Sequence, residues 1–313
     1  MVRYIGKRLL ISVATLFVII LVLFLLLQFM PGSPFNDEKL SPEQIEVLNE
    51  KYGLDRPIHE RFFTYVESLC KGDLGVSYSL SQDTPITTLL RYRFPVTLMI
   101  GIAGMLFGTV IGLLLGFLSS FFKNKLMNLL YYILTIIGIA APSYLIAMFI
   151  SYLFGYRLEL LPLLYDFREP VLTTIMPVIA LSFPVIAVVA RFARGEADEI
   201  IKSDYVMLAR CQGLSKRTII MRYVVRNSLI PVITIMGTLL VGLLTGSLVI
   251  EQMFSIPGIG QLLTNAISAN DYNVVIGLSL VYSLIYIVVM LIVDILYCVI
   301  DPRVRLTGSR KGA

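Results

Sequence analysis

Residues 94–122 read FPVTLMIGIAGMLFGTVIGLLLGFLSSFF, a run without a single charged side chain. An apolar run of about 18 or more residues is typical of a helix that crosses a lipid bilayer. Five similar runs occur elsewhere in the chain, at Leu9–Met30, Leu126–Phe154, Val171–Ala190, Leu229–Ile250 and Val274–Ile300. The sequence therefore predicts an all-α membrane protein with six transmembrane helices.

The composition agrees with a membrane protein. Of the 313 residues, 57% are hydrophobic and 15% are charged, whereas about 25% of the residues of a soluble domain are charged. The mean hydropathy is +0.82. A soluble protein of this size could not keep so much apolar surface out of water, and a disordered chain is far more polar. An ordinary soluble enzyme and a disordered protein are thus excluded.

Residues that could carry catalysis or hold a metal are scarce. The sequence has one histidine, His59, and three cysteines, Cys70, Cys211 and Cys298, without a C-x-x-C spacing. This pattern argues against a zinc site and a disulfide framework. No G-x-x-x-x-G-K-[ST], H-E-x-x-H or G-x-S-x-G motif is present, and we therefore expect no catalytic residue, no metal site and no cofactor bound by this chain.

The basic residues indicate which side of the membrane each loop faces. With the N-terminus inside, 17 of the 26 Lys and Arg fall in cytoplasmic segments, but only five of the 21 Asp and Glu do. Lys and Arg are enriched in the cytoplasmic loops of membrane proteins. We therefore expect a multi-pass protein of the cytoplasmic membrane with both termini in the cytoplasm, surrounded by lipid and without a nucleic-acid partner.

Three parts are expected along the chain. Residues 1–30 are the cytoplasmic N-terminus and the first span, and residues 31–93 are an extracytoplasmic helical segment. Residues 94–313 are the transmembrane core, which includes a cytoplasmic loop at 191–228.

The segment 31–93 carries its own helix signals. The capping box Ser41–Gln44 predicts a helix start, and Gly53 predicts the end of that helix. A second helix is predicted from Asp55–Pro57 to Gly72, and a third is predicted to begin at Thr84-Pro85 and to end before the second span. We expect a solvated cap over the spans, and a docking surface for another protein is the alternative.

Glycines recur along the second span. Gly104, Gly108, Gly112 and Gly116 are four residues apart and so lie on one face of a helix. Glycines on a shared face allow another membrane helix to approach closely. We expect helix packing within the chain at this face, and contact with a second membrane subunit is the alternative.

The loop 191–228 is too long for a simple connection and holds eight basic residues. Ser203 or Asp204 can cap a helix start, and Gly213 can end the helix after about two turns. So short a helix is marginal alone, which indicates that its apolar face, with Tyr205, Leu208 and Ala209, is covered by something else. A loop that rests on lipid headgroups is the alternative.

The segment Asp204–Leu214 resembles the membrane subunits of ATP-binding-cassette importers. Their signature of Glu-Ala-Ala, three residues and Gly is matched by Ala209 and Gly213, while Met207 and Leu208 replace the Glu and the first Ala. The pattern of the peptide-transporting branch, Asp-Tyr-Val, Ala and Gly-Leu, is complete. Further matches lie at Met30–Pro34, Tyr52–Pro57, Gly72–Gly75, Glu251–Gly260 and Asp301–Arg303.

This resemblance implies the fold of a type I importer permease and the first of two membrane subunits of an oligopeptide or dipeptide permease, with the oligopeptide type fitting better. It implies as partners a second homologous membrane subunit, two ATPase subunits that use ATP and Mg, an extracytoplasmic peptide-binding lipoprotein and the peptide. The loop helix would be a coupling helix in a groove of one ATPase. The implied ATPase contacts are Asp204, Tyr205, Leu208, Ala209, Arg210, Gly213 and Leu214.

Other functions are kept as alternatives. Related permeases import metal chelates such as nickel complexes. A carrier driven by an ion gradient is disfavoured, because Asp294 is the only charged residue within the spans and such carriers place ionisable groups at mid-membrane depth. An intramembrane enzyme lacks a visible catalytic pair within the spans.

Overall fold

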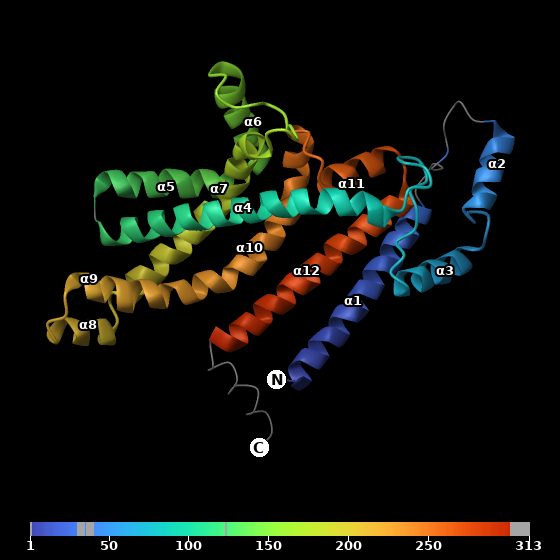
Figure 1. Ribbon diagram of the computed structural model, residues 1–313. Coiled ribbons are helices and arrows are strands. Elements are labelled where there is room, and N and C mark those ends of the chain that lie inside the picture. The colour runs from blue at the N-terminus through green and yellow to red at the C-terminus, as the bar shows by residue number, and fades with distance from the viewer. Residues whose placement is uncertain (1, 30–34, 36–40, 123, 301–313) are drawn as a thin grey trace. The chain divides into compact units, whose positions relative to one another are not determined.

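The computed structural model describes residues 2–29, 35, 41–122 and 124–300, and within these ranges every regular element is a helix (Figure 1). The chain divides into two compact units. The first unit comprises Met1–Val96 and Pro257–Val288, and the second comprises Thr97–Ile256 and Val289–Ala313. The side chain of Asp294 lies outside the part of the chain whose side chains are described.

Five helical stretches are long and apolar enough to span a membrane. They are Arg8–Gln28 in α1 (Val2–Gln28), Ile86–Phe121 which is α4, Pro170–Ile200 which is α7, Lys216–Leu244 which enters α10 (Arg226–Met253), and Tyr272–Val293 in α12 (Tyr272–Ile300). A sixth candidate is a bent pair, Lys125–Ala140 with Ser143–Arg157. Five or six spans therefore agree with the predicted number.

The third predicted span, Leu126–Phe154, is not one straight helix. It consists of α5 (Lys125–Ala140), α6 (Ser143–Ile150) and the π-helix η1 (Ser151–Arg157), with a bend of 114° between α5 and α6. Pro142 has no N–H, and its ring disfavours the helical conformation in the residue before it. Ala141 accordingly has φ −87° and ψ 125°, which ends α5.

In the second unit, the four glycines of α4 lie along α7. A Cβ atom on Gly108 would stand 2.7 Å from Cβ of Val185, and one on Gly116 would stand 2.6 Å from the carbonyl oxygen of Ala190. Gly104 and Gly112 meet the same helix. Any side chain at these contacts would push the two helices apart, and the glycine face of α4 is therefore covered within this chain.

The first unit contains α1, α2 (Pro42–Lys51), α3 (Ile58–Cys70), α11 (Ile259–Ser268) and the beginnings of α4 and α12. The predicted capping box is present, since Ser41 Oγ accepts from the Gln44 N–H at 3.3 Å and Gln44 Oε1 accepts from the Ser41 N–H at 2.9 Å. Gly53 and Gly72 adopt positive φ values of 65° and 79° after α2 and α3, as predicted.

The third helix predicted in this segment is not separate. A helix does begin after Pro85, but it is the start of α4, which continues through Pro95 to Phe121. The predicted boundary between residues 93 and 94 thus falls inside one helix. Pro95 removes one backbone donor without ending the helix, whereas Pro142 ends one.

A buried carboxylate fixes the loop before α4 to the start of α12. The Oδ2 atom of Asp271 accepts hydrogen bonds from the Ser77 hydroxyl and from the backbone N–H groups of Tyr78, Ser79 and Leu80, the last three at 3.0 to 3.1 Å. A buried charge needs partners of this kind. Residues far apart in sequence are thereby held together in the first unit.

Candidate functional site

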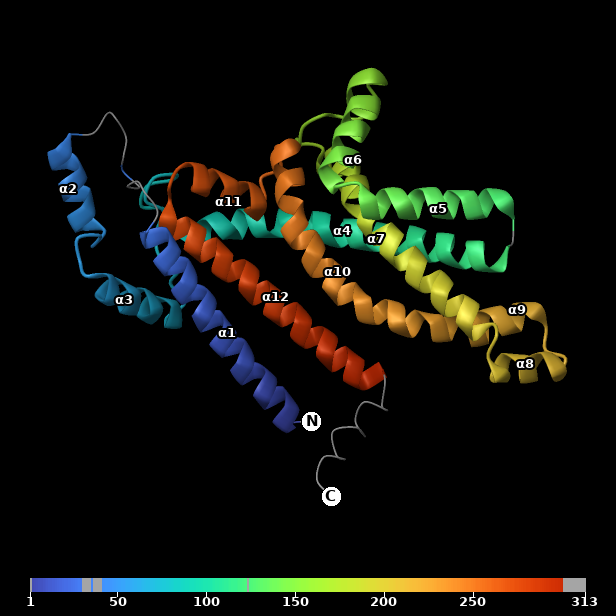
Figure 2. The same ribbon diagram turned by 180° about the vertical axis from the view of Figure 1, so that it is seen from behind.

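The short helix α8 (Asp204–Cys211) lies where α7 ends and where α9 (Lys216–Thr218) leads toward α10 (Figures 1 and 2). It begins after Ser203 and ends before Gly213, whose φ is 75°. The predicted start and stop are therefore present. The Ser203 hydroxyl, however, donates to the carbonyl oxygen of Ile200 at 2.6 Å and makes no side-chain cap.

One face of α8 is buried against the chain's own residues. Val206 and Ala209 are fully or almost fully buried and pack with Ala197, Ile219 and Val224. Leu214, just after the helix, is partly buried on the same cluster. Ala209 and Leu214 thus face the chain itself, whereas the resemblance had placed them among the ATPase contacts.

The other face of α8 is exposed and still partly apolar. Met207, Leu208 and Tyr205 are 62%, 60% and 42% exposed. Asp204 and Arg210 are exposed beside them and complement the helix dipole, with the acid in the first turn and the base in the last. A two-turn helix with large apolar side chains on its outer face is typical of a surface that another protein covers.

Met207 was not among the predicted contacts. It stands at the position where the family signature has Glu, so the side chain at this position is apolar instead of negatively charged. The spacing of Asp204, Met207 and Leu208 by three and four residues places them on one side of α8 and could have identified Met207 as part of the outward face.

Four residues, 212–215, separate α8 from a continuous helical run that leads into the fifth span. Ser215 Oγ accepts from the Thr218 N–H at 3.2 Å and so caps α9, which passes directly into the π-helix η2 (Ile219–Val225) and then into α10. Near the start of α10, Asn227 Nδ2 lies 3.5 Å from the Tyr205 hydroxyl. The helix α8 therefore contacts this run by packing of Val206 and Ala209 against Ile219 and Val224.

A polar cluster ties the end of α7 to its neighbours. Asp198 accepts from the Ser120 hydroxyl of α4 at 2.6 Å and lies 3.7 Å from the guanidinium of Arg194. That guanidinium lies 4.3 Å from the ring centre of Tyr131 on α5. The i, i+4 spacing of Arg194 and Asp198 predicts their pairing, but the partners on α4 and α5 follow only from the fold.

A second polar contact in the same unit involves a fully buried acid, Glu251 near the end of α10. Its Oε1 atom accepts from the Thr97 hydroxyl of α4 at 2.8 Å and from the Ser247 hydroxyl at 3.0 Å. Glu251 belongs to one of the stretches that carry the family resemblance. Its contacts fix α4 to α10.

No group of three His, Cys, Asp or Glu in the described part of the chain is arranged to hold a metal ion. Cys70 and Cys211 are exposed free thiols, and the side chain of Cys298 is outside the described residues.

These observations define a class: a multi-pass membrane protein with a small amphipathic helix on the loop that leads into a span. Residues 108–306 match the family model for the inner membrane component of binding-protein-dependent transport systems, and residues 1–101 match the model for the N-terminal part of such components. The chain belongs to this family of inner membrane components of binding-protein-dependent transport systems.

Curated relatives match the chain along its whole length. The dipeptide transport system permease protein DppB of Lactococcus lactis subsp. cremoris is 42% identical over 98% of this chain and all of that protein. The oligopeptide transport system permease protein OppB of Haemophilus influenzae is 34% identical over 97% of this chain and all of that protein. DppB of Bacillus subtilis is 34% identical over the full length of both.

Proposed function

We propose that this chain is one of two membrane subunits of an ATP-driven, binding-protein-dependent importer of short peptides. The full-length similarity to dipeptide and oligopeptide permeases supports a peptide as the cargo, and it does not favour a metal chelate or an ion-driven carrier. Since the relatives include both permease types, the proposed cargo covers dipeptides and oligopeptides.

The observation that carries the proposal is the two-sided construction of α8. Its inner face is fixed to the second unit through Val206 and Ala209, and its outer face offers Tyr205, Met207 and Leu208. An apolar outer face fits a groove on a separate ATPase. ATP and Mg would be used by two such ATPase subunits, because this chain has no phosphate-binding loop of its own.

The predicted contact residues have two proposed roles: some touch the ATPase, and the others hold or end the helix. Asp204, Tyr205, Leu208 and Arg210, together with Met207, touch the ATPase. Ala209 and Leu214 hold the helix on the membrane subunit, and Gly213 ends it. The cytoplasmic position of this loop rests on the distribution of Lys and Arg, which also places both termini in the cytoplasm and residues 31–93 outside, where the binding lipoprotein docks.

Site-directed cross-linking in the assembled importer tests this proposal. In a chain with its three cysteines replaced by serine, Leu208→Cys should form a cross-link to an ATPase subunit, while Ala209→Cys on the buried face of the same helix should not. Both variants should import peptide only with ATP and the binding protein present. Equal cross-linking of the two positions, or none in a complex that imports peptide, would refute the proposed interface.

A further inference from the structure

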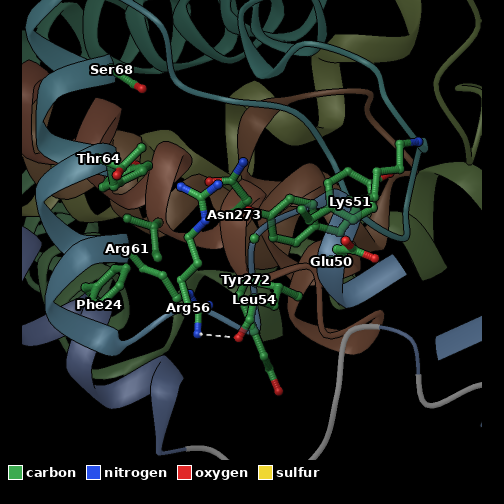
Figure 3. A pocket seen from close by; sticks show the side chains of 15 residues that line it. Phe24, Glu50, Lys51, Leu54, Arg56, Arg61, Thr64, Ser68, Tyr272 and Asn273 are labelled. Carbon is green, nitrogen blue, oxygen red and sulfur yellow. Dashed lines mark hydrogen bonds between the residues drawn. The ribbon is translucent and has the colours of Figure 1, made fainter. Parts of the chain in front are cut away.

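A polar stripe on α3 faces a cavity in the first unit. Arg61, Thr64, Tyr65 and Ser68 follow the i, i+3, i+4, i+7 spacing of one helix face, and all four line a cavity of about 310 Å³. Figure 3 shows labelled side chains of α3, the end of α2 and the start of α12 around this space. Its volume lies at the lower end of the range for ligand sites, about 300–1,000 Å³.

Arg61 is a half-buried cation, and Asp55 is near enough to act on its charge without forming an ion pair with it. Within the described part of the chain its guanidinium makes one long hydrogen bond, from Nη1 to the carbonyl oxygen of Leu54 at 3.5 Å, and no ion pair with a carboxylate. Burial lowers the pKa of this guanidinium. The neighbouring Lys51, in contrast, is paired with Asp83 at 2.7 Å. Most donors of Arg61 are thus available to an anion.

The hydroxyl of Tyr65 provides an independent indication of a ligand. Its oxygen is buried and has no hydrogen-bond partner, although nearly all buried polar groups in proteins have one. It belongs to the same cavity wall as Arg61. A guanidinium with most of its donors unused, together with a nearby hydroxyl without a partner, suits a ligand that accepts several hydrogen bonds and carries negative charge.

The apolar surroundings indicate where this ligand comes from. Phe24 and Ile276 line the cavity and belong to two candidate spans, α1 and α12. On α3 itself, Phe63 is 68% exposed, and its neighbour Phe62 packs 6.0 Å from the ring centre of Phe17 on α1. An amphipathic helix that exposes an aromatic ring beside a span is typical of the membrane interface. These features are the basis on which we assign the cavity to the level of the lipid headgroups.

We propose that this cavity binds the phosphate group of an anionic phospholipid. The fork of Arg61 suits two phosphate oxygens at once, and the hydroxyls of Tyr65, Thr64 and Ser68 suit the remaining acceptors. Among the lining charges that are not otherwise paired, Arg56 and Arg61 outnumber Glu50, which favours an anionic headgroup over a zwitterionic one, even though Asp55, outside the lining, also acts on Arg61. The proposal is independent of the cargo of the importer.

The test uses the complete importer in nanodiscs of phosphatidylcholine, with and without phosphatidylglycerol. Phosphatidylglycerol should be retained on the wild-type complex in native mass spectrometry and should raise its unfolding midpoint. Arg61→Gln should weaken retention about tenfold, whereas Lys71→Gln should not. Lys71 is the matched control, since it loses the same charge from the end of α3 but pairs with Glu67 outside the cavity.

Tyr65→Phe provides a second measurement, which remains informative if the complex with Arg61→Gln fails to assemble. Removal of an unpartnered buried hydroxyl should raise the unfolding midpoint in phosphatidylcholine, and the gain should disappear when phosphatidylglycerol is present. Undiminished retention by Arg61→Gln, or an equal loss with Lys71→Gln, would overturn the proposal. An equal thermal shift from soluble inorganic phosphate would overturn the lipid as the source of the anion.

Discussion

Two short amphipathic helices of this chain, α8 and α3, differ in the chemistry of the face that is not packed against their own unit. Each buries one apolar face against its own unit, through Val206 on α8 and Phe62 on α3. The remaining face of α8 exposes apolar side chains, while the remaining face of α3 lines a cavity with Arg61 and hydroxyl groups. The chemistry of the second face, rather than the length of the helix, indicates the partner: a protein groove for α8 and an anion for α3.

We expect the largest effect from a charged side chain on the buried face of α8. Val206→Asp would bury an unpaired carboxylate among apolar side chains, at a cost of about 3 kcal/mol or more. We expect α8 to detach, with loss of ATPase binding in pull-down experiments and faster proteolysis of the loop 191–228. Phe62→Asp should detach α3 instead and leave ATPase binding intact. Loss of ATPase binding in both variants would mean that the two helices are not independent.

Two glycines that end these helices provide the next comparison. Gly213 and Gly72 both have positive φ, and a Cβ atom on either would meet no atom within 4 Å. The Cβ atom of a valine at either position therefore causes no steric clash with other residues, but the valine strains the backbone by about 1 kcal/mol or more, because positive φ is unfavourable for a β-branched residue. Gly213→Val should abolish peptide uptake while membrane insertion is retained. Gly72→Val should leave ATP hydrolysis coupled to transport. Normal uptake by Gly213→Val would refute the role of this helix end.

Truncation of the exposed α8 face should have a smaller effect. Tyr205→Ala should leave the complex assembled but lower peptide uptake about tenfold, the cost of one strong interface side chain. Stimulation of ATP hydrolysis by peptide-loaded binding protein should be lost. Phe63→Ala, which removes an exposed aromatic ring from α3, should preserve that stimulation. Wild-type stimulation in Tyr205→Ala would count against the proposed coupling.

The smallest effect concerns the rim of the α3 cavity. Hydrogen bonds from Lys51 and Tyr52 lower the pKa of Asp83 below its ordinary value of 3.8. The stabilisation is therefore present above pH 3.8 and is lost as the pH falls through the lowered pKa of the folded state. Because the pair is exposed, we expect only a small acid-induced increase in hydrogen exchange at the end of α2. Asp83→Asn should remove this pH dependence; an unchanged profile would exclude Asp83 as its source.

The sequence correctly predicted the structural features that depend on residues adjacent in the sequence. The apolar runs, the capping box at Ser41 and the helix stops at Gly53 and Gly213 are all local, and the structure contains each of them. The effect of a proline is not local: Pro142 interrupts a helix, whereas α7 continues through Pro177 and Pro184. Whether a helix tolerates the lost hydrogen bond depends on the helices packed around it.

The sites depend on long-range contacts and were less predictable. The contact of Asp271 with the loop at Ser77 joins residues 194 positions apart, and no sequence spacing indicates it. A single apolar face with Tyr205, Leu208 and Ala209 was predicted for α8, but Tyr205 and Leu208 are exposed while Ala209 is buried together with Val206. In so short a helix, a shift of one residue changes which side chains face outward, and only the packing against η2 determines it.

The unbroken helical run from Lys216 to Met253 has a consequence for the length of this segment. Each residue advances a helix by about 100° around its axis. Inserting or deleting one residue between Arg226 and Pro231 would therefore turn η2, and α8 packed on it, by that angle relative to the rest of α10, even with every side chain of the interface kept. The number of residues in this segment sets the rotational phase between α8 and the fifth span.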